Sequence, residues 1–419
     1  MAHYHIWDIG CQMNKADSER LAASLEALGH RPSPTLEGAD IIVVNSCVVR
    51  QSAEERVANR LSSLKPLKQA RPELVIALTG CMVDSNTQPL HRRFPHVDLF
   101  LRPQEFTELL ERVGGTGLKL EPPIPYPTPP AVFVPVIHGC DNFCSYCIVP
   151  FRRGRERSRP LAEVVCEVEG LVRRGAREVT LLGQNVNAYG HDLSGHPTLA
   201  QLLAALNGIE GLARIRLLTS HPRDITPEFI QGVARLDKVC EHLSLPVQAG
   251  DDVILAAMKR GYSADWYRQL IAAIRQAIPG VALSTDVIVG FSGETEEQFG
   301  RTLALLEEIR FDVVHVAAYS PRPGTAASRL PDDVPPQVKK ERLQRVEALE
   351  AGIAAEVNAA LEGRTVEVLV EGRKGGKWEG RTRTNKLVFF PDPAERLGQL
   401  VMVRIEKASP WALQGLLSP

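Results

Sequence analysis

Residues 132–147 read VFVPVIHGCDNFCSYC. The apolar run 132–137 predicts a buried strand, and three cysteines follow it directly. Five more strands are expected downstream, with amphipathic helices such as 161–174 and 296–309 between them; these strands are 178–182, 215–219, 241–245, 282–289 and 312–318. Six strand–helix units predict an incomplete (β/α)6 barrel of the triosephosphate-isomerase (TIM) type over residues 131–361. The active site of such a barrel lies at the carboxyl ends of its strands.

The segments on either side of this barrel have different patterns. Residues 1–120 alternate strands (3–9, 40–44, 74–78) with helices, one opened by Asp17 and Ser18, which predicts a parallel sheet covered on both faces. Residues 121–130 contain six prolines and are expected to be a linker, since proline interrupts helices and central strands. Residues 362–419 show short alternating strands (365–370, 387–390, 400–405) and glycine-rich turns, which predict a small all-β barrel.

Length and composition are those of a globular protein. With 419 residues, of which 44% are hydrophobic and 24% charged, the chain is expected to form two to three domains at roughly 150 residues each. Residues 1–10 lack the pattern of a signal peptide, and no apolar run is long enough to span a membrane. We therefore expect a cytoplasmic protein without membrane contact.

The formal net charge of −1 hides two basic segments. Residues 152–159 contain five arginines and one glutamate, and the tail 361–419 has ten basic and seven acidic residues. The two segments carry net charges of +4 and +3, so the rest of the chain carries a net charge of −8. Local basic patches on an acidic body favour a nucleic-acid partner, although solvated charged faces would look the same in the sequence.

The eight cysteines are not expected to form disulfides in a cytosolic chain. Cys140, Cys144 and Cys147 are three thiols without a fourth, which favours a 4Fe-4S cluster with one open iron over zinc or incidental cysteines.

A second set of cysteines is expected from the fold. Cys11, Cys47 and Cys81 each follow a predicted parallel strand, so they are expected to meet at one edge of the sheet. They could hold a second cluster or be three small buried residues. For Cys166 and Cys240 we expect burial in the core.

Several motifs together resemble the radical S-adenosylmethionine (SAM) methylthiotransferases of the MiaB type. The resemblance covers essentially the whole chain and rests on 10–14 (GCQMN), 45–47 (NSC), 79–82 (TGCM), the triad with 148–156 (IVPFRRGRE), 183–187 (GQNVN), 219–222 (TSHP) and 381–386 (RTRTNK). It implies a flavodoxin-like N-terminal domain, a radical SAM barrel and a C-terminal RNA-binding TRAM domain.

The resemblance also implies an activity, namely insertion of a methylthio group at C2 of N6-isopentenyladenosine beside the tRNA anticodon. The implied cofactors are SAM and two 4Fe-4S clusters, one on the triad and one on Cys11, Cys47 and Cys81. Alternatives are a methylthiotransferase acting on N6-threonylcarbamoyladenosine, and a non-catalytic iron–sulfur redox sensor that binds RNA. Expected partners are the anticodon stem-loop of tRNA, an electron donor such as flavodoxin or ferredoxin, and the iron–sulfur assembly machinery; a monomer is expected.

Further site residues are expected at the strand ends and in the basic segments. The residues expected to bind SAM are Tyr146, Gly183, Gln184, Asn185, Gln248, Asp286 and Ser320. The residues expected to bind RNA are Arg152, Arg153, Arg373, Lys374, Lys377, Arg381, Arg383 and Lys386, with Trp378 and Phe389 available for stacking on bases.

Overall fold

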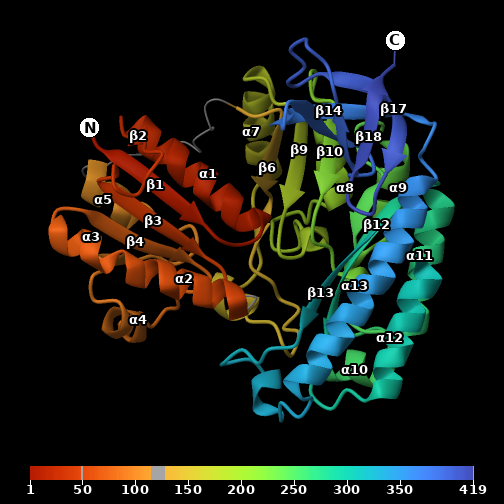
Figure 1. The fold of residues 1–419 in the computed structure, drawn as a ribbon, viewed down its shortest axis with the longest axis horizontal. Helices are drawn as coiled ribbons and strands as arrows, with labels where there is room; N and C mark the ends of the chain where they lie inside the picture. The colour runs from red at the N-terminus through yellow and green to blue at the C-terminus, as the bar shows by residue number, and fades with distance from the viewer. Residues whose placement is uncertain (49–50, 115–127, 419) are drawn as a thin grey trace. The chain divides into compact units, whose positions relative to one another are not determined.

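The computed structural model describes residues 1–48, 51–114 and 128–418. The chain divides into two compact units (Figure 1). The first unit holds Met1–Pro127, His138–Phe143 and Cys147–Arg157, and the second holds Thr128–Ile137, Cys144–Tyr146 and Ser158–Pro419. Most of the expected linker 121–130 lies outside the described residues.

The first unit is built on a five-stranded sheet with the order β2-β1-β3-β4-β5, in which every pairing is parallel. The flavodoxin-like parallel sheet expected from the sequence is thus confirmed. The strands are β1 (His3–Asp8), β2 (Arg31–Pro32), β3 (Ile41–Ser46), β4 (Val75–Gly80) and β5 (Leu99–Phe100). The helices are α1 (Gln12–Ala27), α2 (Gln51–Ser63), α3 (Lys65–Ala70), α4 (Gln88–Arg93), α5 (Thr107–Gly114) and α6 (Val149–Arg153).

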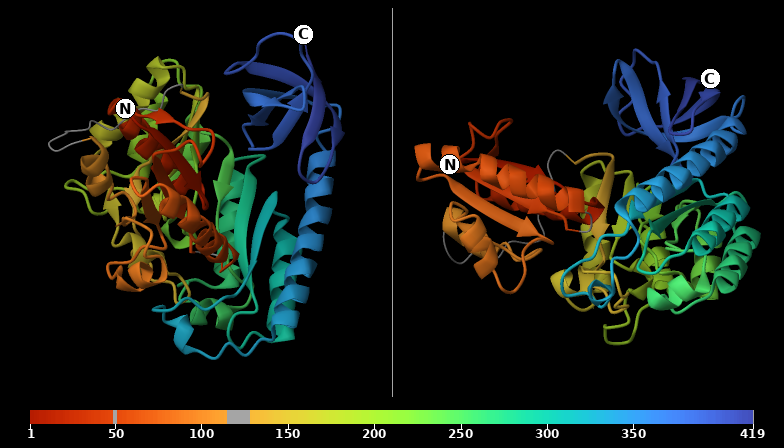
Figure 2. Two further views of the ribbon diagram at one scale, coloured as in Figure 1. Left: turned by 60° about the vertical axis from the view of Figure 1, so that its left-hand side comes forward. Right: turned by 60° about the horizontal axis from the view of Figure 1, so that its bottom comes forward.

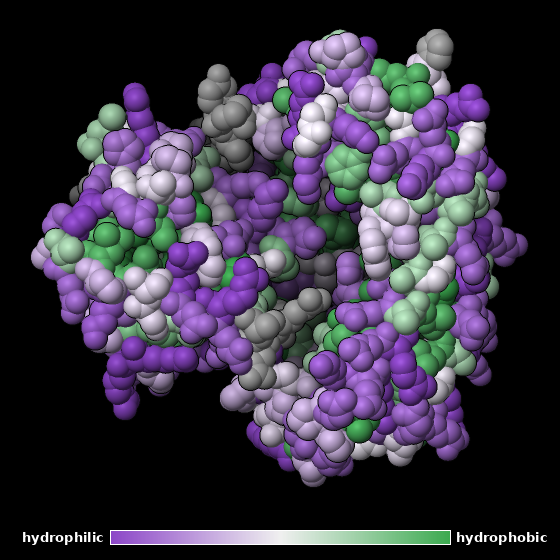
Figure 3. Space-filling view, in the orientation of Figure 1, coloured by the Kyte–Doolittle hydropathy of each residue, from purple (hydrophilic) through white to green (hydrophobic). Residues whose placement is uncertain are grey.

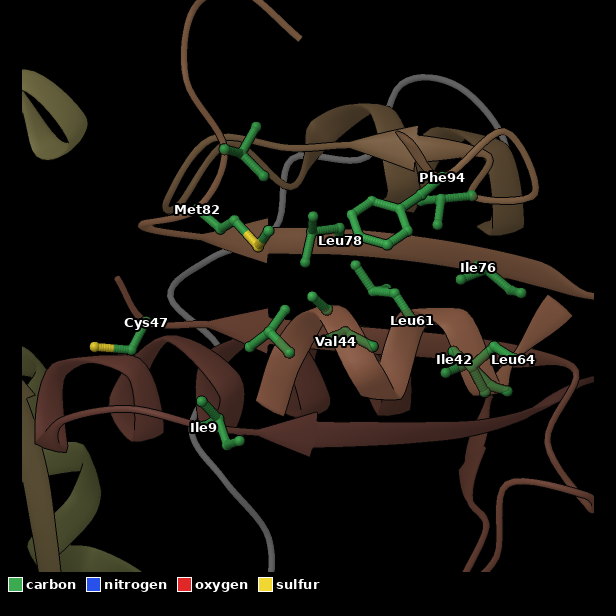
Figure 4. Close-up of a cluster of buried hydrophobic side chains, with 14 of the residues drawn as sticks. Ile9, Ile42, Val44, Cys47, Leu61, Leu64, Ile76, Leu78, Met82 and Phe94 are labelled. Carbon is green, nitrogen blue, oxygen red and sulfur yellow. The ribbon is translucent and has the colours of Figure 1, made fainter. Parts of the chain in front are cut away.

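Helices cover both faces of this sheet, which is why β3 is buried along its whole length. On one face Leu61 of α2 packs with Val44 and Leu78 (Figure 4). On the other face Leu21 and Leu25 of α1 pack against residues of β3 and β4. The helix α1 begins at Gln12 rather than at the expected Asp17 and Ser18, because Cys11 takes the N-cap position and both expected openers are buried inside the helix.

The second unit contains the six expected barrel strands, arranged as two parallel three-stranded sheets. One has the order β10-β9-β6 and the other β11-β12-β13. The strands are β6 (Ala131–Pro135), β9 (Glu178–Leu182), β10 (Arg214–Leu217), β11 (His242–Ser244), β12 (Ala282–Val289) and β13 (Val313–Ala318). Between the sheets only the isolated bridge from Ile215 to Val239 continues the pairing among the described residues. Two short strands, β7 (Ile137–His138) and β8 (Arg157–Ser158), lie near the cysteine triad in the sequence.

The helices of this unit are α7 (Leu161–Arg173), α8 (Leu199–Asn207), α9 (Pro227–Arg235), α10 (Asp252–Ala257), α11 (Ala264–Ala277), α12 (Glu296–Ile309) and α13 (Pro336–Ala359). The two helices expected at 161–174 and 296–309 are confirmed as α7 and α12, and the structure adds the others of this unit. Thr295 and Gln298 form a capping box at the start of α12, which satisfies two backbone N–H groups that the first turn would leave unpaired. Cys240 is buried as expected, whereas Cys166 is exposed on α7, so the core prediction for Cys166 is wrong.

The chain after α13 forms a closed barrel with the order β14-β15-β16-β18-β17 (Figure 2). Its strands are β14 (Thr365–Lys374), β15 (Lys377–Thr382), β16 (Leu387–Phe390), β17 (Leu400–Ala408) and β18 (Leu413–Leu417). The all-β barrel is confirmed, but only three of its five strands were expected. The turn at Gly375 and Gly376 has φ of 57° and 81°, a region that glycine adopts without strain.

The β15–β16 turn docks this small barrel onto the strands β9 and β10. Nη1 of Arg214 donates to the carbonyl of Arg381 at 2.7 Å, and Arg216 donates to the carbonyls of Thr382 and Arg383 at 2.6 and 2.7 Å. Nε of Arg216 also donates to Glu178 at 2.6 Å. Buried arginines therefore bind backbone that would otherwise lose its hydrogen bonds to water.

The visible faces of both units are covered mainly by hydrophilic residues, with hydrophobic ones in small patches (Figure 3). In the described part of the chain, no helix combines the length and the apolar character needed to cross a bilayer.

Candidate functional site

Cys11, Cys47 and Cys81 lie at the carboxyl edge of the N-terminal sheet. Cys47 and Cys81 directly follow β3 and β4, and Cys11 caps α1 just after β1. These three strands are neighbours, with Ser46 opposite Gly80 in the register. The sulfur of Cys47 points away from the packed side chains of the core, beyond the strand ends (Figure 4). The fold therefore brings the three loops that carry these cysteines together.

Two asparagines brace this edge. Nδ2 of Asn14 donates to Oδ1 of Asn45 at 2.9 Å and to the carbonyl of Ser46 at 2.8 Å, and Nδ2 of Asn45 donates back to the carbonyl of Asn14 at 2.8 Å. The thiol of Cys11 lies 3.4 Å from Oδ1 of Asn14. Both asparagines are buried, so this network holds the loops of Cys11 and Cys47 in a defined arrangement.

The close approach of β4 to β3 requires glycine at position 80. Gly80 has φ of +90°, and a Cβ there would lie 2.3 Å from the carbonyl oxygen of Ser46. In return, the backbone N–H of Cys81 donates to that same oxygen at 2.9 Å. In the sequence, Gly80, Asn14 and Asn45 stand out only as members of the motifs 79–82, 10–14 and 45–47. Their supporting roles depend on strand register, which the sequence pattern does not specify.

Arg153, at the end of α6, is buried at this same edge. Its Nε lies 3.4 Å from Sγ of Cys81, its Nη1 lies 3.1 Å from Oδ2 of Asp17, and its Nη2 lies 3.2 Å from Oδ1 of Asn14. The side chains of Arg153 and Asp17 are each only 3% exposed. The guanidinium is thus surrounded by protein acceptors, and the prediction that Arg153 contacts RNA is wrong for this structure.

The neighbouring Arg152 forms an ion pair with Asp84 and is 20% exposed. Partial burial raises the pKa of Asp84, but hydrogen bonds from Ser85 together with the charge of Arg152 outweigh it, so the pKa is lowered. Arg155 is more exposed than Arg152: its side chain is 73% exposed and pairs with Asp141 at 2.7 Å. The structure therefore divides the basic segment into buried and accessible charges.

Within the triad, Cys140 and Cys147 belong to the first unit and Cys144 to the second. The backbone N–H of Cys140 donates to the carbonyl of Gly154 at 3.2 Å, and Nδ2 of Asn142 lies 3.7 Å from its sulfur. Gly139, with φ of +76°, precedes Cys140; a Cβ on it would collide with the carbonyl of Arg155 at 2.0 Å. The backbone around Cys140 is therefore fixed tightly by the segment that follows the triad.

Cys144 is buried beside Arg260. Nη1 of Arg260 lies 3.2 Å from Sγ of Cys144, Nη2 donates to the carbonyl of Pro246 at 2.8 Å, and Nε donates to the hydroxyl of Tyr262 at 2.9 Å. Tyr146 packs, partly buried, against the cluster that contains Met258. Sequence reasoning missed Arg260, because 116 residues separate it from the cysteine it contacts.

Most of the expected cofactor residues lie at or near the carboxyl ends of barrel strands, whereas Asp286 lies in the middle of β12 and Tyr146 lies between Cys144 and Cys147. Gly183, Gln184 and Asn185 follow β9, Gln248 follows β11, Asp286 lies within β12 and Ser320 follows β13. Gly183 is required sterically, because a Cβ there would lie 2.4 Å from Cγ2 of Ile137. Asn185 is 1% exposed; its Nδ2 donates to Asp224 at 2.6 Å and its Oδ1 accepts from the backbone of His221 at 3.1 Å.

Among the described residues, several buried polar atoms near these strand ends have no hydrogen-bond partner. Three of them are Oδ1 of Asn187, Nε2 of His221 and Oε1 of Gln248. Burial, with a smaller effect of Arg260 and Arg223, lowers the pKa of His221 to about 2, so its imidazole is neutral. Buried polar atoms normally have partners, so these three fit a polar cofactor or substrate at the barrel mouth.

The donor set of the two cysteine groups also fits iron–sulfur chemistry. Each group consists of thiols, and each has a guanidinium beside one sulfur. In the parts of the chain that the structure describes, no three His, Cys, Asp or Glu side chains converge on a position for a single metal ion. A cluster holds its thiolates farther apart than one ion does, because each thiolate binds a different iron.

The residues of the C-terminal barrel that were expected to bind RNA fall into two groups at opposite ends of β15. Arg373, Lys374 and Lys377 are exposed around the β14–β15 turn. At the other end, Arg383 pairs with Glu241 at 2.7 Å and Lys386 pairs with Asp312 at 2.7 Å.

The charges of Arg383 and Lys386 are therefore used within the protein, and we correct their assignment from RNA binding to docking. Arg381 lies near this end of β15, with Nε 3.7 Å from Oε2 of Glu371. Trp378, expected to stack on bases, is only 4% exposed and donates to the carbonyls of Asp392 and Ala394, so it belongs to the core of the barrel.

Three protein-family models match the chain. The Radical SAM superfamily matches residues 134–306, the Uncharacterized protein family UPF0004 matches residues 3–102, and the TRAM domain matches residues 359–417. Together these models cover both cysteine groups and the C-terminal barrel.

Curated relatives match from end to end. A protein of Dehalococcoides mccartyi named tRNA-2-methylthio-N(6)-dimethylallyladenosine synthase is 50% identical over 418 residues, which are 100% of this chain and 99% of the relative. Proteins of the same name from Chloroflexus aurantiacus and Herpetosiphon aurantiacus are 50% and 46% identical, over 99% of this chain and 91% and 97% of the relatives.

Among solved structures, the radical SAM methyltransferase TsrM from Kitasatospora setae matches with a TM-score of 0.58 and 14% identity, over 78% of this chain and 76% of that one. The cobalamin-dependent SAM radical enzyme OxsB matches with a TM-score of 0.52 and 12% identity, over 84% and 56%. At these identities the likeness shows the fold alone.

Proposed function

The chain belongs to the family of tRNA-2-methylthio-N(6)-dimethylallyladenosine synthases, and from this premise we propose how its own residues carry out that reaction. It is a radical SAM methylthiotransferase that acts on tRNA and uses SAM and a 4Fe-4S cluster. The substrate is assigned as N6-isopentenyladenosine, also called dimethylallyladenosine. This assignment is preferred over a methylthiotransferase acting on N6-threonylcarbamoyladenosine and over a non-catalytic iron–sulfur sensor. The full-length match to relatives of that name is the observation that carries this conclusion.

We propose that Cys140, Cys144 and Cys147 hold the cluster that binds SAM, and that Cys11, Cys47 and Cys81 hold a second 4Fe-4S cluster. When bound, the triad cluster and SAM supply the radical chemistry that removes a hydrogen from the unactivated C2 of adenosine, which no acid or base in the chain could do. The second site is proposed to supply the sulfur. Support comes from the neighbouring strand ends that carry its three cysteines.

In this proposal the chain's own residues position these groups. Tyr146 and residues 183–185 line the SAM site, together with Gln248, Asp286 and Ser320. The partnerless atoms of Asn187 and His221 would hydrogen-bond to the cofactor or the target nucleoside. Nδ1 of His221 accepts from the backbone N–H of Arg223, so the neutral imidazole carries its proton on Nε2, which would donate without adding a charge.

The remaining features extend the proposal beyond the active site. The proposed domain borders lie at residues 120, 130 and 361. The C-terminal barrel would bind the phosphates of tRNA through Arg373, Lys374 and Lys377, while Arg152 and Arg155 lie near the triad in sequence and would contact the anticodon stem-loop. We further propose a cytoplasmic monomer that receives electrons from a flavodoxin or ferredoxin and clusters from the assembly machinery.

Mass spectrometry of tRNA nucleosides tests the substrate. The protein reacts anaerobically with SAM, dithionite and tRNA that carries N6-isopentenyladenosine, and we expect the 2-methylthio derivative. A matched reaction uses tRNA that carries N6-threonylcarbamoyladenosine. Product only in the second reaction would contradict the proposed nucleoside, and no product with either tRNA would favour the sensor.

Iron analysis tests the two clusters. Reconstituted protein should hold about eight irons, and the variant with Cys140, Cys144 and Cys147 changed to alanine should hold about four. Cys166→Ala is the matched control, since this exposed cysteine lies in neither group. A folded triple variant without iron would contradict the second cluster.

A further inference from the structure

We propose that Arg153 is a positioning residue of the N-terminal cluster, and that it raises the reduction potential of that cluster through its contact with Cys81. This inference rests on the proposed function, because it requires a cluster on Cys11, Cys47 and Cys81. Arg153 stands in the basic segment after the triad, so its sequence context favours RNA. Its environment is instead buried protein, with Nε 3.4 Å from Sγ of Cys81.

The three contacts of the guanidinium use its planar fork. Nε faces a sulfur at the end of β4, while Nη1 and Nη2 face Asp17 and Asn14 on α1. A lysine could not reach all three acceptors at once, because its ammonium is a single point on a flexible chain. The arrangement therefore requires arginine in particular and not merely a positive charge.

Arg153 is also connected to the other two cysteine loops. Asn14, which accepts from Nη2 of Arg153, lies 3.4 Å from the thiol of Cys11 and donates to the carbonyl of Ser46, the residue before Cys47. One buried cation thus reaches all three loops, either directly or through one side chain.

Burial of a charged pair is poorly explained by stability alone. Taking Arg153 and Asp17 out of water costs free energy that their attraction only partly recovers, and apolar side chains of similar volume would often serve as well. A buried pair beside a ligand sulfur has a different use. Hydrogen bonds and positive charge near cluster sulfurs stabilise the reduced, more negative state, which raises the reduction potential.

The short helix α6 and the glycine after it set the position of Arg153. The helix α6 has Pro150 in its first turn and ends at Arg153, and Gly154 follows with φ of 79°. Helix α6 packs within the first unit, where Ile148 joins the core cluster of the sheet. Arg152, one residue earlier, pairs with Asp84 instead, so adjacent arginines on the same helix have different environments.

The test measures the potential of the N-terminal cluster by itself. The full chain carries Cys140, Cys144 and Cys147 changed to alanine, is reconstituted anaerobically, and is titrated by EPR. Into this background we introduce Arg153→Met, Arg153→Lys and the double change Asp17→Asn/Arg153→Met. The double variant avoids leaving the buried Asp17 carboxylate without a partner. Arg152→Met is the matched control, since Arg152 has the same charge and lies on the same helix.

We expect Arg153→Met and the double variant to be reduced less readily. At a fixed potential the ratio of reduced to oxidised cluster should fall about tenfold, which is about 59 mV for a one-electron couple. Arg153→Lys should shift the potential partway, and Arg152→Met should leave it unchanged.

The other outcomes are distinct. An unchanged potential in the iron-replete double variant would overturn the inference, and so would an equal shift in Arg152→Met. Loss of iron from the double variant alone would assign Arg153 to cluster retention and overturn its role in the potential. A background protein without iron would instead overturn the second cluster itself, which separates failure of the proposed function from failure of the inference.

Discussion

Replacing Arg373, Lys374 and Lys377 together by alanine should weaken the binding of tRNA and flatten its dependence on salt. All three side chains are exposed around one turn of the C-terminal barrel. Removing one phosphate-binding charge lowers the slope of log affinity against log salt by roughly 0.7 to 0.9, so removing three lowers it by roughly 2 to 3. Raising the salt from 50 to 200 mM should therefore weaken tRNA binding by both proteins, and the fold loss of affinity should be roughly 20 to 40 times larger for the parent than for the variant.

The matched control is Arg383→Ala/Lys386→Ala, which removes charges from the other end of β15. These charges pair with Glu241 and Asp312, so their removal should leave the salt slope unchanged and lower the thermal unfolding midpoint instead. Filter binding of whole tRNA across a salt series measures the slope, and iron content shows that the variants remain loaded. A parental slope in the triple variant, or a reduced slope in the control, would refute the division of the basic residues into two groups.

Gly80→Ala should destabilise the first unit by at least about 2 kcal/mol, since it adds a clash with Ser46 to a backbone of positive φ. The control is Gly29→Ala, because Gly29 also has positive φ but has open space around it. Thermal unfolding midpoints of the two variants show whether the clash adds to the cost of the backbone conformation. Arg216→Met should cost about 3 kcal/mol, because the buried Glu178 loses its closer cation and keeps only Arg214 at 3.8 Å, while the carbonyls of Thr382 and Arg383 lose their donor; an unchanged unfolding midpoint would contradict this. Burial lowers the pKa of His242 to about 3, so the folded protein holds this imidazole neutral. The free energy of unfolding is therefore unaffected by His242 above its unfolded pKa near 6.5, and it decreases as the pH falls from there toward 3. The parent should lose roughly 2 kcal/mol of its free energy of unfolding through His242 at pH 5, and His242→Leu should not show this loss. Equal dependence of the free energy of unfolding on pH in the parent and the variant would contradict this role of His242.

The order of elements and the cysteine chemistry were determined by the sequence itself. Hydrophobic periodicity placed α12 at its observed bounds and β16 likewise, because both are decided by residues within one turn or one strand. The approach of Cys11, Cys47 and Cys81 could be predicted as well, since parallel neighbouring strands have their carboxyl ends at one edge. Two of the five strands of the C-terminal barrel were not expected, because β15 is interrupted by glycine and charged residues and β18 by glutamine and glycine.

The partners of the arginines were decided only by the tertiary structure. Arg152, Arg153 and Arg155 look alike in the sequence, yet one pairs with an aspartate, one is buried beside a cysteine sulfur and one is exposed. Arg383 and Lys386 likewise read as an RNA-binding surface and instead dock one barrel on another. The physical reason is that charge is a property of the residue, whereas the burial and pairing of Arg153 and Arg383 depend on groups that lie 72 to 142 residues away and meet only after folding.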